Sequence, residues 1–301
     1  MAMALALVSA HLRLVNSGLG CAEWPQCYGR IGAPASSAAP VENDTGAARL
    51  AHRVLASALG IVVLLVVAAN LRRHGTRIAA GLLLLVTLGL AALGKHSAGL
   101  EQPAVVMANY SGGMILVASL WWLRNSVAAP RSGYSPSLRR WSLFCLAALS
   151  VQLLSGGLVS AYFAGLACGP SIDCNGHWLP DLPWDVISTF FGHLALDDTG
   201  TVAMGRSLSG LHMAHRIGGV ALVAILAWLA WSLHQSGRSR LACTILALTS
   251  AAALAGVLAV RMQLPHGMVL SHYTLALALL LATLTAVATG RASRHDGADM
   301  R

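Results

Sequence analysis

Long apolar runs separated by short polar loops dominate the sequence. Eight such runs lie at about residues 1–15, 50–71, 78–93, 104–123, 141–163, 211–233, 241–260 and 268–288. A helix needs about 20 apolar residues to cross the hydrocarbon core of a bilayer. Backbone groups in lipid must be hydrogen-bonded within the spanning segment, which favours helices over open strands. The pattern therefore predicts an all-α integral membrane protein with eight transmembrane helices.

The loops between these runs alternate in charge. Twelve of the 20 basic residues fall on one side of an eight-span arrangement: Arg72, Arg73, Arg77, Arg124, Arg131, Arg139, Arg140, Arg238, Arg240, Arg291, Arg294 and Arg301. Nine of the 11 acidic residues fall on the other side: Glu23, Glu42, Asp44, Glu101, Asp173, Asp181, Asp185, Asp197 and Asp198. The positive-inside rule makes the basic side cytoplasmic. We therefore expect a multi-pass protein of a bacterial inner membrane with both termini in the cytoplasm.

Composition agrees with this interpretation. Hydrophobic residues make up 56% of the chain and charged residues only 10%, whereas about a quarter of the residues of a soluble protein are charged. The mean hydropathy is +0.66. These values exclude an ordinary soluble domain and a disordered chain. The net charge of +9 is then a signal of membrane topology, and no nucleic-acid partner is expected.

An internal repeat divides the chain into two halves. The motif Gly-Leu-x-Cys-x5-Cys-x-Gly begins at Gly18 and again at Gly165, and an Ala-His-Arg triplet follows each copy. Because each copy includes four apolar runs, we predict two pseudo-symmetric four-helix bundles. The expected units are an N-terminal half (1–127), a cytoplasmic linker (128–140), a C-terminal half (141–290) and a cytoplasmic tail (291–301).

The first apolar run is short and contains two polar residues, His11 and Arg13. A secretory signal peptide is the competing interpretation, but the run lacks a basic start and a clear cleavage site. In the second copy more apolar residues precede the matching Leu-Val-Ser-Ala tetrapeptide. We therefore expect a first helix that is truncated at its start.

Four cysteines lie in loops on the acidic side, as Cys21 with Cys27 and Cys168 with Cys174. A disulfide in each pair suits an oxidising compartment. Each pair is then either a structural staple or a redox-active pair that exchanges with a partner. Zinc binding by the four thiols is a third and weaker alternative.

Three histidines lie near the outward ends of apolar runs that all cross in the same direction. His52 and His215 each precede an arginine, Arg53 or Arg216, and His272 follows His215 by 57 residues, the spacing that separates Asn109 from His52. Ionisable residues inside spans are costly and mark functional sites. Facing imidazoles are a common way to hold haem iron in a helical bundle.

Two residues near His215 also bear on this predicted haem site, one as a binding partner and one as an alternative iron ligand. Arg216 lies beside one ligand near a helix start, where it is placed to meet a haem propionate. His212, one turn before His215, is a competing ligand.

The chain resembles the haem A synthase family in these elements. The match includes the first outward loop (16–29), which reads NSGLGCAEWPQCYG, the second cysteine loop (165–179), both His-Arg pairs and His272. The resemblance implies a b-type haem held by His215 and His272. It also implies oxidation of a methyl group of haem O to a formyl group in the N-terminal half. His52 would ligate the substrate iron, Arg53 would pair with a propionate, and Cys21–Cys27 would be the nearby disulfide.

Two positions depart from the family pattern. The family usually has a second histidine where this chain has Asn109, and a glutamate where it has Arg49. An amide is a poor iron ligand, and loss of the carboxylate removes a proton acceptor. Expected partners are haem O, the enzyme that makes it, a membrane electron donor such as a quinol, and the lipid bilayer. A second copy of the chain, forming a homo-oligomer, is a further candidate partner.

Two rival functions follow from the same residues. One is a non-catalytic relative that binds haem b and carries electrons or delivers haem. The other is a quinone-linked thiol oxidant that uses the two cysteine pairs.

Overall fold

The computed structural model of the protein describes residues 1–17, 24–25, 27–31, 45–73, 76–94, 101–128, 135–178, 184–198, 200–203 and 206–289. The secondary structure of this part consists of helices and isolated bridges. Its helices are α1 (Ala2–Asn16), α2 (Thr45–Asn70), α3 (Arg77–Leu93), α4 (Pro103–Ala128), α5 (Pro136–Ala161), the 3-10 turn η1 (Ala164–Leu166), α6 (Trp184–Ser188), α7 (Arg206–Gln235), α8 (Ser239–Arg261) and α9 (His266–Thr289). The predicted apolar runs match the long helices to within a few residues, and the short helix α6 was not predicted.

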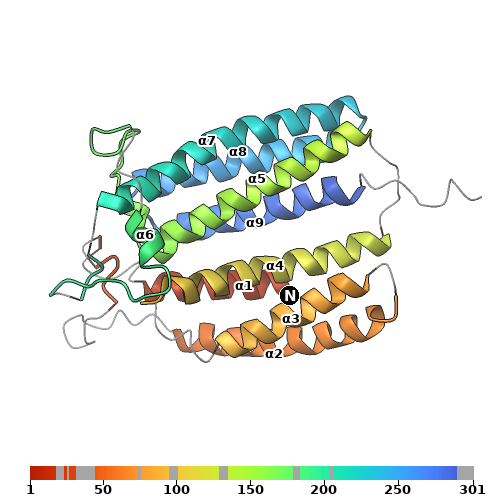
Figure 1. Ribbon diagram of the computed structural model, residues 1–301, viewed down its shortest axis with the longest axis horizontal. Coiled ribbons are helices and arrows are strands. Elements are labelled where there is room, and N and C mark those ends of the chain that lie inside the picture. The colour runs from red at the N-terminus through yellow and green to blue at the C-terminus, as the bar shows by residue number, and fades with distance from the viewer. Residues whose placement is uncertain are drawn as a thin grey trace, which may run out of the picture.

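The long helices run side by side along the longest axis of the molecule (Figure 1). Helices α1 to α4 pack in sequence against one another, and α5, α7, α8 and α9 form a second packed group. Contacts of α4 with α5 and α9, and of α1 with α9, join the two groups. The last of these places the first helix of the chain beside the last.

Six of the described helices are long and apolar enough to cross a membrane: Thr45–Asn70, Pro103–Asn125, Pro136–Ala161, Ser207–Gln235, Ser239–Arg261 and His266–Thr289. The apolar helices Ala2–Asn16 and Arg77–Leu93 are shorter. The structure therefore confirms an all-α, multi-pass membrane protein. It gives six helices of spanning length, where the sequence pattern predicts eight spans.

Several hydroxyls inside these helices are hydrogen-bonded within their own helix. The hydroxyls of Ser150, Thr249 and Thr283 each donate to the carbonyl four residues earlier, at 2.7–2.9 Å. Such bonds satisfy a hydroxyl without a partner on another helix, as a lipid environment requires. Small side chains line the buried face of α8, among them Ala252 and Ala255. Helices without large side chains at their contact can approach closely.

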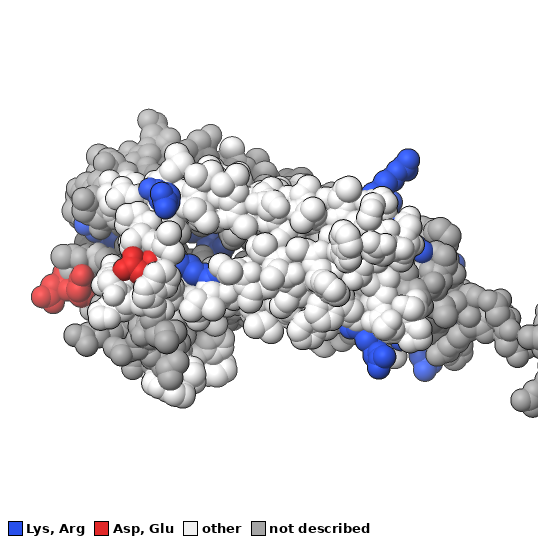
Figure 2. Space-filling model, turned by 90° about the horizontal axis from the view of Figure 1, so that it is seen from above, with Lys and Arg blue, Asp and Glu red and all other residues white. Residues whose placement is uncertain are grey.

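The cysteine-rich loops gather at one end of the molecule. The Val202 N–H donates to the Gly29 carbonyl at 3.0 Å, and the Trp24 indole donates to the Gln263 carbonyl at 2.8 Å. These bonds tie the first loop to the segment before α7 and to the turn before α9. On the face shown in Figure 2, acidic side chains lie at one end, basic side chains lie at both ends, and the middle carries no charged side chain. A belt without charge suits the hydrocarbon core of a bilayer.

Candidate functional site

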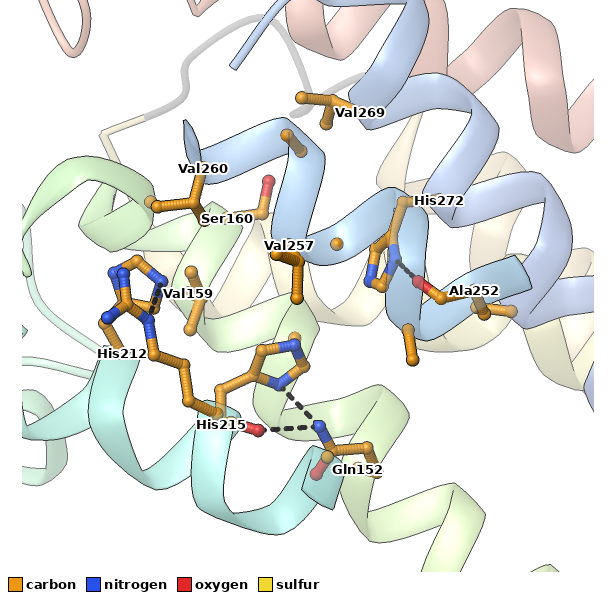
Figure 3. A pocket seen from close by; sticks show the side chains of 18 of the residues that line it. Gln152, Val159, Ser160, His212, His215, Ala252, Val257, Val260, Val269 and His272 are labelled. Carbon is orange, nitrogen blue, oxygen red and sulfur yellow. Dashed lines mark hydrogen bonds between the residues drawn. The ribbon is translucent and has the colours of Figure 1, made fainter. Parts of the chain in front are cut away.

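A cavity of about 740 Å³ lies among α5, α7, α8 and α9, with α1 and α4 along one side. Most of its wall is apolar, with Val159, Val257 and Val260 among the side chains drawn in Figure 3. The volume falls within the range of about 300–1,000 Å³ typical of ligand pockets. Figure 3 shows His215 on α7 and His272 on α9 as side chains of this one pocket. The predicted imidazole pair therefore comes together at a cavity large enough for a ligand.

The ring of His215 is fixed by two polar residues of α5. Its Nδ1 lies 2.8 Å from the Ser155 hydroxyl oxygen, and that hydroxyl lies 3.0 Å from the Gln152 carbonyl, to which it donates. With its hydrogen on the Gln152 carbonyl, the hydroxyl oxygen can accept a hydrogen bond from Nδ1 of His215. The Gln152 amide nitrogen, which carries two hydrogens, lies 3.1 Å from Nδ1 and donates to the His215 carbonyl at 2.9 Å. In the tautomer with the proton on Nδ1, the Nε2 lone pair of His215 is available for a metal, as in known metal-bound histidines.

The ring of His272 is fixed in a similar way by α8. Its Nδ1 donates to the Ala252 carbonyl at 2.8 Å. That carbonyl is an acceptor only, so the proton is on Nδ1 and the Nε2 lone pair is available here too. His272 therefore has the tautomer that leaves Nε2 for a haem iron, and the Ser155 hydroxyl can hold His215 in the same tautomer.

A glycine on the neighbouring helix makes room for each ring. A Cβ at Gly156 on α5 would lie 2.9 Å from Cε1 of His215, and a Cβ at Gly256 on α8 would lie 3.0 Å from Cε1 of His272. The first contact is closer than real Cβ atoms come and the second is tighter than most, so an added methyl group would require either ring to shift. A haem held between His215 and His272 fits this site. Gly156 and Gly256 leave room for the two rings, the wall is apolar, and each imidazole has an Nε2 atom to offer.

His212 also lines this cavity, but its imidazole has a different partner. It is 3% exposed, and its Nε2 accepts a hydrogen bond from Nε of Arg216 at 3.3 Å. An Nε2 that accepts this bond has committed its lone pair. The structure therefore separates the ligand candidate His215 from the competitor one turn earlier.

The guanidinium of Arg216 is held by the loop between Cys168 and Cys174. Its Nη2 donates to the Gly169 carbonyl at 2.8 Å, and its Nη1 donates to the Ser171 carbonyl at 2.8 Å and contacts the carbonyls of Ile172 and Asp173. The sequence assigned Arg216 to a propionate. The structure shows it as a tether that holds this loop over one end of the cavity.

The loop itself is closed by a disulfide between Cys168 and Cys174. Both residues are at most 1% exposed and pack against Met213 of α7. Exchange with a partner requires access to a sulfur. This pair is therefore a buried staple in the structure. Cys27 is buried and disulfide-bonded, whereas Cys21 lies outside the described residues.

The N-terminal candidates lie elsewhere. His52 is half-buried on α2, with Arg49 and Arg53 exposed on the same helix, and Asn109 is half-buried on α4. None of the four lines the cavity described above. The catalytic roles predicted for His52, Asn109 and Arg49, and the propionate contact predicted for Arg53, stay predictions.

Sequence reasoning missed the residues of α5 that support His215. Gln152, Ser155 and Gly156 are polar or small residues inside an apolar span, and polar residues there are functional candidates by default. That signal was available. Which helix they face depends on the rotation of α5, and the sequence does not give this rotation.

The fold and the cavity define a multi-pass helical membrane protein with a paired-imidazole site. The model of the COX15-CtaA family, described as cytochrome oxidase assembly protein, matches residues 1–284. The chain belongs to this family. A relative named Heme A synthase from Shewanella oneidensis is 31% identical over 93% of this chain and 90% of its own length.

Two further relatives carry the same name. The Heme A synthase of Halalkalibacterium halodurans is 24% identical over 78% of this chain and 75% of its own length. That of Shouchella clausii is 26% identical over 59% of this chain and 62% of its own length. The resemblance inferred from the loop and histidine motifs is thus confirmed at the level of the family.

Proposed function

We propose that this protein is a haem A synthase, an oxidoreductase that converts a methyl group of haem O to a formyl group for cytochrome oxidase assembly. Membership of the COX15-CtaA family and the relatives named Heme A synthase support this activity. The structural observation that carries it is the facing pair His215 and His272, each with its Nδ1 hydrogen-bonded, in one apolar cavity.

The proposal assigns a haem b to this cavity. Nε2 of His215 and Nε2 of His272 would ligate its iron, and Ser155 and the Ala252 carbonyl would hold the rings in place. When bound, this haem supplies one-electron redox chemistry. The protein contributes the ligands, the two glycine cradles that fit the rings, and an apolar wall that limits access of water.

The reaction itself is assigned to the N-terminal half. His52 would bind the iron of the substrate haem O, with Arg53 toward a propionate, while a quinol or another membrane donor exchanges electrons with the C-terminal haem. The C8 methyl would be hydroxylated twice by an external two-electron oxidant, and the resulting gem-diol would lose water to give the aldehyde. In this proposal α1 and α3 also cross the membrane, the helices form two four-helix units, and both termini are cytoplasmic.

A variant pair tests this assignment of the two halves. Full-length protein is expressed with a haem O source, and the membrane pigments are extracted and identified. His52→Ala is expected to accumulate haem O without haem A and to keep haem b. His215→Ala is expected to lose haem b. Conversion of haem O by His52→Ala at the wild-type rate would exclude His52 as the substrate ligand.

A non-catalytic haem carrier is the second candidate. The amide at Asn109 and the exposed guanidinium of Arg49 stand where the resemblance places a ligand and a proton acceptor. In the same expression experiment this candidate predicts bound haem b and unchanged haem O. The thiol-oxidant alternative is disfavoured by the burial of Cys168 and Cys174.

A further inference from the structure

An arginine of the first helix reaches the cavity of the other half. Arg13, near the end of α1, lines the cavity together with residues of α5, α7, α8 and α9. Its Nη1 donates to the Ser160 hydroxyl of α5 at 2.7 Å, and its guanidinium carbon lies 5.5 Å from the centroid of the Tyr110 ring. A guanidinium over an aromatic face is held by cation–π attraction. Arg13 is thus a fixed cation in the wall.

The charges around the cavity are all of one sign. Arg13, Arg216 and Arg261 line it, and no carboxylate does so within the described part of the chain. Burial raises the pKa of Tyr28, which also lines the cavity, to about 12, so this phenol is neutral at neutral pH. Unbalanced positive charge in an apolar wall favours an anionic ligand.

The three arginines differ in exposure and in how many of their N–H groups are already hydrogen-bonded. Arg216 uses its three nitrogens on His212 and on loop carbonyls. Arg261 is exposed. Among the described residues, the only hydrogen bond of the Arg13 guanidinium is the one to Ser160. The Ser160 oxygen accepts that bond and keeps its own proton to donate. A guanidinium and a hydroxyl side by side can bind both oxygens of one carboxylate.

The position of Ser160 on α5 shows how far the Arg13–Ser160 pair lies from the His215 ring along the helix. Ser160 follows Gly156, the residue against which the His215 ring packs, by four residues on α5. Four residues of helix rise by about 6 Å, toward the end with the cysteine loops. The guanidinium therefore lies about one turn outward of the level of the His215 ring.

We propose that Arg13 and Ser160 form a carboxylate-binding subsite of this cavity. It takes one carboxylate of the ligand that His215 and His272 hold, that is, a propionate of a haem. The inference rests on the proposed function, because the haem is what that function assigns to the cavity. It also gives the N-terminal half a part in the C-terminal haem site: α1 supplies the anion-binding group that Arg216 was expected to supply.

A binding comparison tests this subsite without measuring activity. Haem-free, full-length protein in detergent is titrated with haem b and with its dimethyl ester, in which both propionates are masked. A desolvated charge-assisted bond is worth a tenfold difference in affinity or more. Wild type is expected to prefer haem b over the ester by about tenfold or more. Arg13→Leu is expected to bind the ester like wild type and to lose most of this preference.

Arg124→Leu is the matched control. Arg124 also lies over an aromatic ring, 4.9 Å from the Trp121 centroid, but does not line the cavity. It is expected to keep the full preference. Ser160→Ala, which removes the hydroxyl partner, is expected to weaken the preference partially, and it decides the question if Arg13→Leu does not fold.

The outcomes separate the subsite from the haem site. An unchanged preference in folded Arg13→Leu, or in Ser160→Ala if Arg13→Leu does not fold, would overturn the proposal. So would an equal loss of affinity for haem b and ester, since this would mean that Arg13 only supports packing. Wild-type protein that binds both ligands equally would refute the subsite and leave the haem site intact. Wild-type protein that binds neither would instead refute the proposed haem site.

Discussion

Single hydrogen bonds decide which histidines can act as ligands. The Ala252 carbonyl places the ring proton of His272 on Nδ1, Ser155 contacts Nδ1 of His215, and Arg216 engages Nε2 of His212. The repeat favours His215 over its neighbour His212, and the structure adds a chemical reason. Ser155 contacts His215 from another helix, α5, whereas Arg216 contacts His212 from within α7.

This assignment predicts opposite results for the two neighbouring histidines. If His215 ligates a haem b iron as proposed, His215→Ala should lose the low-spin bis-imidazole spectrum and most of the bound haem b. His212→Ala leaves Nε2 of His215 untouched and should keep both. Absorption spectra and the haem-to-protein ratio measure this. The reverse pattern would show that His212 is the ligand.

The support of His215 by Ser155 has its own consequence. Partners of metal-bound histidines typically change metal affinity by about 10–100-fold when they are removed. Ser155→Ala should lower haem affinity by such a factor and shift the haem reduction potential. Ser150→Ala on the same helix is the control, because among the described residues that hydroxyl bonds only the Leu146 carbonyl. Equal haem affinity and potential in both variants would rule out a role of Ser155 in positioning His215.

At the scale of helices, close packing shapes the cavity. Alanine normally stabilises a helix by about 0.5–1 kcal/mol relative to glycine. At Gly156 and Gly256 the added methyl group would instead meet an imidazole. Gly156→Ala and Gly256→Ala should therefore displace the rings and lower the haem content of the purified protein.

A control glycine makes this comparison specific. Gly89 on α3 has nothing within 4 Å of an added Cβ. Gly89→Ala should leave the haem content unchanged and keep or raise the thermal stability. Full haem content in Gly156→Ala and Gly256→Ala would show that the cavity does not depend on these cradles.

The loop between Cys168 and Cys174 covers one end of the cavity. Replacing both cysteines by serine removes a short covalent loop, which costs about 2 kcal/mol in the chain-entropy model. The variant should melt at a lower temperature and still convert haem O. Loss of turnover at a temperature where the variant is fully folded would support redox exchange by this pair instead.

Most helices could be predicted from the sequence, and their contacts could not. The apolar runs give the long helices closely because length and hydropathy suffice for that. The repeat singles out His215 because its Ala-His-Arg triplet occurs twice. It singles out His272 because the spacing from His215 equals that of Asn109 from His52. The roles of Gln152, Ser155 and Arg13 depend on how α5 and α1 are rotated and on which helices they touch. The tether at Arg216 likewise depends on the path of a loop.

At the scale of the whole molecule, the two halves are not independent. α1 contacts α4 and α9, and Arg13 brings the N-terminal half into the cavity of the C-terminal half. The weak hydrophobicity of the first run, with His11 and Arg13, then has a structural reason. Arg13 bonds Ser160, and His11 lies 2.9 Å from His266 at the start of α9. The polar residues of the first helix thus connect the two halves.

The identity of the haems bound by the purified full-length chain tests the central claim most directly. The protein is expressed with a haem O source, purified in detergent, and its haems are extracted and separated. A haem A synthase with its cofactor in the C-terminal half predicts haem b together with haem A. Haem b with unconverted haem O, or with no second haem, would contradict synthase activity. Absence of any haem would contradict the site formed by His215 and His272.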